Sequence, residues 1–107
     1  MRLIDLDPHW VVDVVGKRIG FTFVSPANAR MRQSCFPNPP PRRAQYKIWA
    51  GMYADDPSIV QGCNPNALWT VAGGIEAASF DTLTVTPSID GSPGGLWHGY
   101  ITNGAIV

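Results

Sequence analysis

The stretch Arg18-Ile19-Gly20-Phe21-Thr22-Phe23-Val24 decides the fold class. Its apolar side chains recur at every second position, at Ile19, Phe21 and Phe23. Successive side chains of a strand point to opposite faces, so this pattern predicts a half-buried β-strand.

Strand-like segments also lie on both sides of this stretch. They are His9–Val15, Gln45–Ala50, Leu68–Ala72, Phe80–Thr86 (the most regular alternation, with Pro87 expected to end it), Trp97–Thr102 and Ala105–Val107. Asn103-Gly104 between the last two is a strong signal for a type I′ hairpin. Helical potential is confined to one turn in Ala27–Gln33. We therefore predict a mainly β protein: a small, compact antiparallel sheet or sandwich-like domain with at most one short helix and a C-terminal β-hairpin.

The length of 107 residues predicts a single domain over residues 1–107. Eleven glycines and ten prolines favour short elements and many turns. Within the domain, residues 27–66 are expected to form a long, Pro-rich, irregular insertion, which includes Phe36–Arg43 and a loop over Gly51–Asn66.

The formal net charge is zero, but its two parts are separated along the chain. Residues 1–47 hold all eight basic residues against three acidic ones, a net charge of +5. Residues 48–107 hold five acidic residues and no basic one, a net charge of −5. A balanced total argues against a dedicated nucleic-acid binder and suggests that the two halves complement each other, within one chain or between copies.

Residues for catalysis are few, so no enzyme activity and no cofactor are expected. His9 and His98 each stand beside a tryptophan, and Ser25 and Ser88 each neighbour a proline without a recognisable triad spacing. The cysteines Cys35 and Cys63 are 28 residues apart without a CxxC motif, which fits free thiols in a reducing compartment, with a disulfide between them as the alternative. We find neither a secretory signal nor a membrane span in the sequence.

Two groups of residues are candidates for binding. The segment 17–47 has seven cations and no carboxylate, and we take Arg30, Arg32, Arg42, Arg43 and Lys47 as a basic patch for nucleic acid or a host factor. Its alternative is pairing of these arginines with the acidic half of the same or a neighbouring copy. The tryptophans Trp10, Trp49, Trp69 and Trp97 fall one per expected strand and suit the core or a subunit interface, with a sugar or peptide groove as the alternative.

The C-terminal third carries a resemblance to a known family. The stretches Phe80–Ile89 (FDTLTVTPSI) and Trp97–Gly104 (WHGYITNG) resemble the ending of small uncharacterised proteins of phages and prophages, classed as a domain of unknown function. The start is also similar, in Leu6–Trp10 and Arg18–Phe23, while residues 27–66 are not covered. The resemblance implies origin and fold, and no reaction.

The family resembled also carries a four-ligand zinc site in many members. Its positions correspond here to Ser25-Pro26-Ala27-Asn28 and Leu96-Trp97-His98, so three of four ligands are missing. No metal site is therefore expected, with His98 as a vestigial ligand and Cys35 and Cys63 as remote candidates.

These observations favour a non-enzymatic binding or assembly protein of phage or prophage origin. It would be a virion-associated accessory component of the capsid or tail decoration type, acting through protein–protein contacts with itself, as a homo-oligomer, or with a larger phage assembly. The expected location is the virion or the host cytoplasm. The alternatives are a nucleic-acid or host-factor module that uses residues 17–47, and a degenerate zinc-dependent hydrolase.

Overall fold

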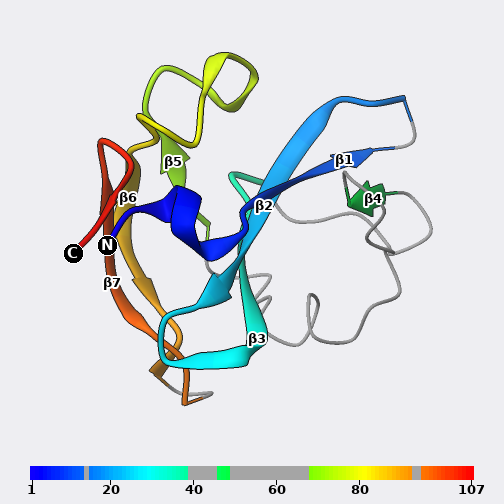
Figure 1. The fold of residues 1–107 in the computed structure, drawn as a ribbon. Helices are drawn as coiled ribbons and strands as arrows, with labels where there is room; N and C mark the ends of the chain where they lie inside the picture. Colours follow the sequence, from blue (N-terminus) through cyan, green and yellow to red (C-terminus); the bar gives the residue numbers. More distant parts are fainter. Residues whose placement is uncertain (14, 39–45, 49–67, 93–94) are drawn as a thin grey trace.

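The computed structural model describes residues 1–13, 15–38, 46–48, 68–92 and 95–107. In these ranges the chain forms two antiparallel sheets of four strands each, and its helical elements are two 3-10 turns (Figure 1). This confirms the predicted mainly β, sandwich-like fold.

The first sheet has the strand order β3-β2-β1-β4, with β1 at His9–Asp13, β2 at Arg18–Ser25, β3 at Asn28–Cys35 and β4 at Tyr46–Ile48. As predicted, Phe21 and Phe23 of β2 point into the core and are fully buried. Thr22, on the opposite face, is fully buried as well, because the Arg32 guanidinium lies over it and its Nε donates to the Thr22 hydroxyl at 3.1 Å. The central strand β2 is therefore buried on both faces.

The second sheet has the order β5-β6-β7-β8, with β5 at Thr70–Val71, β6 at Val85–Asp90, β7 at His98–Thr102 and β8 at Ala105–Ile106. The predicted C-terminal hairpin is confirmed: Asn103 and Gly104 join β7 to β8 with φ values of 47° and 75°, as a type I′ turn requires. The chain's N-terminal end lies along β8, where Leu3 N donates to Gly104 O and Ile106 N donates to Met1 O.

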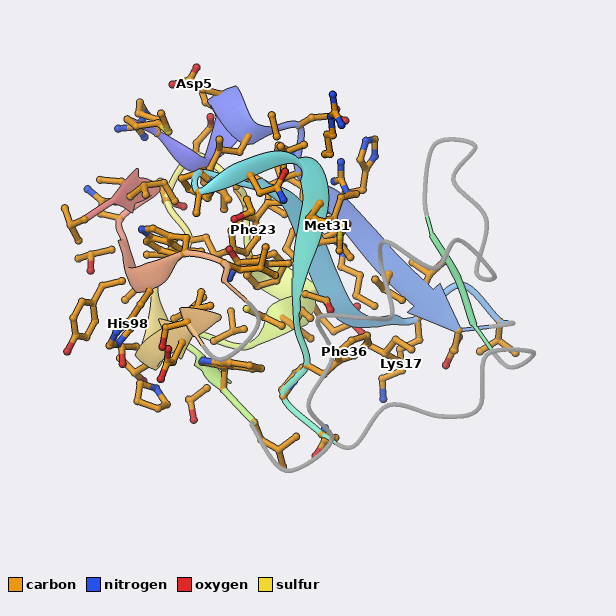
Figure 2. The ribbon with its side chains drawn as sticks, turned by 90° about the horizontal axis from the view of Figure 1, so that it is seen from below. Asp5, Lys17, Phe23, Met31, Phe36 and His98 are labelled. Carbon is orange, nitrogen blue, oxygen red and sulfur yellow. The ribbon has the colours of Figure 1, made fainter. Side chains whose placement is uncertain are left out.

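The core lies between the two sheets. It is closed at one end by the 3-10 turn η1 (Leu3–Leu6). Figure 2 shows Phe23 in the middle of this layer. The buried core residues are Leu3, Leu6, Phe21, Phe23, Cys35, Val71, Leu83, Val85, Ile89 and Ile101. Both sheets contribute to this list, so neither sheet has a complete core without the other.

The helical turn predicted in Ala27–Gln33 is wrong. Ser25 pairs with Asn28 across a tight turn, and the chain returns as β3 with Phe23 opposite Gln33 and Phe21 opposite Cys35. Pairing with an already extended neighbour outweighs the weak local preference of this segment. The irregular region predicted for residues 27–66 accordingly contains the strand β3.

The strand predicted at Phe80–Thr86 is also misplaced, since β6 runs from Val85 to Asp90 and includes Pro87. The register with β7 shifts between Val85 and Ile89, and proline is tolerated at such a bulge because its missing N–H has no ladder partner to lose. The backbone before β6 has other partners: Leu83 O accepts from Gly104 N, and Thr84 O accepts from Ala72 N.

The other predicted strands agree with the structure. β1 lies in His9–Val15, β4 lies in Gln45–Ala50, β5 lies in Leu68–Ala72, and β7 and β8 lie in the two C-terminal segments. The predicted loop at Gly51–Asn66 and most of the Pro-rich run Phe36–Arg43 lie outside the described residues.

Candidate functional site

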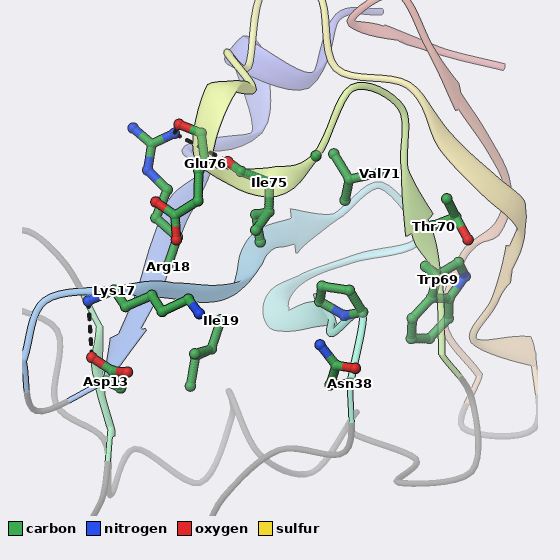
Figure 3. Close-up of a pocket in the computed structure, with 12 residues that line it drawn as sticks. Asp13, Lys17, Arg18, Ile19, Asn38, Trp69, Thr70, Val71, Ile75 and Glu76 are labelled. Carbon is green, nitrogen blue, oxygen red and sulfur yellow. Dashed lines mark hydrogen bonds between the residues drawn. The ribbon is translucent and has the colours of Figure 1, made fainter.

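A pocket of about 590 Å³ opens between β2 of the first sheet and β5 of the second (Figure 3). This volume falls in the range of roughly 300–1,000 Å³ typical of ligand sites. Four separate segments supply its walls: the β1–β2 turn, residues 37–38, the β5 region and the 3-10 turn η3 (Ile75–Ala77). The lining residues are Asp13, Lys17, Arg18, Ile19, Pro37, Asn38, Trp69, Thr70, Val71, Gly74, Ile75 and Glu76.

The β1–β2 turn forms the charged rim of this pocket. Asp13 Oδ1 accepts hydrogen bonds from the backbone N–H of Val15 at 3.0 Å and of Lys17 at 2.8 Å. An aspartate that bonds its own following backbone holds a turn of this kind. The Lys17 side chain is exposed, and Figure 3 draws it along the pocket toward Ile19.

Arg18 fixes the opposite wall. Its guanidinium lies 4.2 Å from the Trp10 ring centroid, and its Nη1 donates to the carbonyl oxygens of Ala78 at 2.9 Å and Ile75 at 3.3 Å. The cation thus ties the first sheet to η3 of the C-terminal half. Because its guanidinium already donates to these carbonyl groups, Arg18 holds the wall of the pocket in position and is not assigned a role in binding a ligand.

The pocket combines an apolar interior with polar groups of different kinds. Trp69, Val71 and Ile75 supply apolar surface, and Trp69 is held by a bond from its Nε1 to Ser88 O at 3.3 Å. Lys17 and Glu76 provide exposed charges of opposite sign, while Asn38 and Thr70 provide neutral donors and acceptors. This surface suits a ligand with an apolar body and both donor and acceptor groups, such as a peptide segment.

The residues proposed as a basic patch do not form one surface in the part of the chain that is described. Arg30 is exposed on β3, whereas Arg32 is 7% exposed. Arg32 Nη1 bonds Asp7 Oδ2 at 3.2 Å and its Nη2 donates to the Asp7 carbonyl oxygen. This contradicts the assignment of Arg32 to an external patch, because its guanidinium is consumed inside the fold. Arg42, Arg43 and the Lys47 side chain lie outside the described residues.

Three of the four tryptophans pack against the core. Trp10 stacks on Phe80 with ring centroids 4.2 Å apart, and Trp97 meets Phe23 edge to face at 6.0 Å. Trp69 also contacts the core and in addition lines the pocket. The fourth, Trp49, lies outside the described residues.

His98, which the resemblance suggested as a vestigial zinc ligand, lies on the outer face of the second sheet, on the side of the molecule opposite Lys17 (Figure 2). Its Nε2 is 3.4 Å from Ser88 Oγ and its Nδ1 is 3.9 Å from Asp90 Oδ1. Cys35 is buried in the core, and Cys63 lies outside the described residues. No three His, Cys, Asp or Glu side chains gather as metal ligands within the described ranges.

The sequence predictions missed the pocket and the Ser88–Asp90–His98 cluster. The cluster was missed because the strand was expected to end at Pro87, whereas β6 continues to Asp90 and places Ser88 and Asp90 two residues apart in one strand. No local sequence pattern predicts the pocket, because its four wall segments come together only when the two sheets pack.

Comparison with known proteins adds no relative: no protein family, curated protein or solved structure matches the chain. None of the described residues belongs to a helix long and apolar enough to cross a membrane. The class defined by fold and site is a two-sheet antiparallel β protein with an open pocket between the sheets.

Proposed function

We propose that this protein is a non-enzymatic binding protein that acts through protein–protein contacts, as an accessory assembly component of phage or prophage type. The pocket between β2 and β5 receives a segment of the partner, which is a second copy or a larger assembly. The phage part rests on the sequence resemblance, and the binding role rests on the pocket. The proposed location is the virion or the host cytoplasm.

The mixture of positive and negative charges around the pocket is the reason why we expect a protein partner. Lys17 and Glu76 present opposite signs on the same pocket, with the Asp13 carboxylate beside Lys17. The phosphates of a nucleic acid are attracted by the cation but repelled by the carboxylates. A peptide segment that carries positive and negative side chains is attracted by the cation and by the carboxylates. The mixed rim therefore favours a protein over a nucleic acid.

Charge reversal at this rim tests the proposal. Lys17→Glu and Glu76→Lys each change an exposed side chain, so the fold is expected to be retained. Arg30→Glu reverses an equally exposed cation on β3, away from the pocket, and is the matched control. Self-association is measured by analytical ultracentrifugation, and peptide binding is measured after selection of a random peptide library on the protein.

We expect the protein to associate with itself or to bind selected peptides. Lys17→Glu should weaken the affinity of that binding by about tenfold, equivalent to about 1.4 kcal/mol, and Arg30→Glu should leave it unchanged. A chain that stays monomeric, selects no pocket-dependent peptide and is absent from purified virions contradicts the proposal. Binding of single-stranded DNA with a steep salt dependence would instead support the nucleic-acid alternative.

A further inference from the structure

The outer face of the second sheet holds a serine, a carboxylate and a histidine close together, from the adjacent strands β6 and β7. Ser88 Oγ lies 3.4 Å from His98 Nε2, and His98 Nδ1 lies 3.9 Å from Asp90 Oδ1. A hydroxyl, an imidazole and a carboxylate in this order are the groups that activate a serine nucleophile. The pocket described above does not include any of them.

Strand register creates this arrangement. Asp90 of β6 is paired directly with His98 of β7, and Ser88 lies two residues before Asp90. The bulge between Val85 and Ile89 sets Ser88 outside the regular ladder. The imidazole Nε2 therefore lies within hydrogen-bond distance of the Ser88 hydroxyl, while Nδ1 faces the Asp90 carboxylate at 3.9 Å, a distance that allows charge attraction but no direct hydrogen bond.

The groups on either side of the imidazole are held in place. The Ser88 carbonyl oxygen accepts a hydrogen bond from Trp69 Nε1 at 3.3 Å, which fixes the backbone that carries the hydroxyl. Asp90 Oδ1 accepts from the Ser92 hydroxyl at 2.5 Å and from the Ser92 backbone N–H at 3.0 Å. These bonds hold the carboxylate in its charged form near the imidazole.

We propose that Ser88 is a nucleophilic serine that accepts one acyl group from an activated ester, with His98 as the base. Ser88 Oγ forms a bond to the ester carbonyl carbon while its proton passes to His98 Nε2. The bond from that carbon to the leaving oxygen then breaks, and the leaving group takes the proton from Nε2. The products are an O-acylated Ser88 and the free alcohol or phenol, so no oxidant or further reactant is needed. The site is a modification site that goes beyond the proposed binding role.

Acetylation by p-nitrophenyl acetate tests the proposal, because peptide mass mapping locates an acetyl ester on serine. We expect acetyl at Ser88 in the parent, and we expect the peptide that contains residue 88 to carry no acetyl group in Ser88→Ala. His98→Ala should slow acetylation of Ser88 by about 100-fold, near the lower end of what a general base contributes. His98 is exposed, so the variant should fold, and His98→Gln serves as a second variant if circular dichroism shows otherwise.

Two variants provide matched controls. Ser79→Ala removes another exposed serine, and His9→Ala removes the other histidine, which pairs with Asp7 at 3.1 Å. Both should leave the rate at Ser88 unchanged. Acetyl groups found only on amines, such as the Met1 amino group and Lys17, would overturn the proposal. An equal rate at Ser88 with and without the His98 imidazole would overturn it as well. Neither result bears on the pocket, so the two proposals fail independently.

Discussion

At the scale of single residues, Asp90 illustrates how neighbouring groups change the pKa of an exposed carboxylate. The Ser92 hydroxyl, followed by the Ser92 backbone N–H, lowers the pKa of Asp90 below its ordinary value. Desolvation opposes this shift, and the attraction of His98 adds the smallest lowering effect. A carboxyl whose pKa is lower in the folded state stabilises the fold above the unfolded-state pKa. That contribution is lost as the pH falls through the folded-state value.

Ser92→Ala should therefore raise the pKa of Asp90, though not fully to the ordinary value, because the backbone N–H remains. The variant should also lose less stability than the parent when the pH is lowered through the folded-state pKa of Asp90. Carboxyl chemical shifts followed through an acid titration measure the first effect, and thermal unfolding over the same range measures the second. An unchanged Asp90 titration in Ser92→Ala would show that its hydroxyl has no such role.

At the scale of elements, the turn between β7 and β8 depends on Gly104. Its φ is 75°, and a Cβ at this position would collide with the carbonyl oxygen of Asp81. We expect Gly104→Ala to lower the free energy of unfolding by more than about 1–2 kcal/mol, the cost of the left-handed conformation alone. Urea denaturation measures this loss. Asn103→Gly at the adjacent turn position, with φ 47°, should cost far less, so equal effects of the two variants would contradict the explanation.

Elements were predictable where a local pattern and the final pairing agree. The alternation around Phe21 and the Asn103-Gly104 turn each predicted the observed structure. β3 was not predictable, because its buried side chains include Arg32 and Gln33, whose partners Asp7 and Trp97 are distant in sequence. Its polar side chains are buried only because these distant partners bond them, so its composition resembles that of an exposed segment and does not predict a buried strand.

The separation of charge along the chain has a partial explanation at the scale of the whole molecule. Arg2 and Arg18, from the basic half, donate to backbone carbonyl oxygens of Asp81, Ile75 and Ala78 in the acidic half. These contacts bring the halves together through carbonyl groups and leave the carboxylates of Glu76 and Asp81 exposed. Among the residues that the structure describes, the acidic half therefore finds only part of its complement inside one chain, which is consistent with the proposed contact between copies.

The whole molecule also depends on a polar link between its sheets at Gln33, which is 3% exposed. Gln33 Nε2 donates to Trp97 O at 3.1 Å, and its Oε1 accepts from Trp97 N at 3.0 Å and from Ser25 Oγ at 2.7 Å. Gln33→Leu keeps a similar size but leaves the Trp97 N–H and the Ser25 O–H without their acceptor, each at a cost of about 1–3 kcal/mol if water cannot replace the amide. Trp97 O keeps its hydrogen bond from Gly91 N–H.

Since the Trp97 groups are only part-buried, we expect Gln33→Leu to destabilise the fold by about 2 kcal/mol in total, toward the lower end of that range. The urea midpoint at constant slope measures this change. Arg30→Gln, at an exposed position of the same strand, should stay within about 0.5 kcal/mol of the parent. If Gln33→Leu matches the parent in stability, the apolar layer around Phe23 suffices to join the sheets, and the amide serves only to fix the strand register.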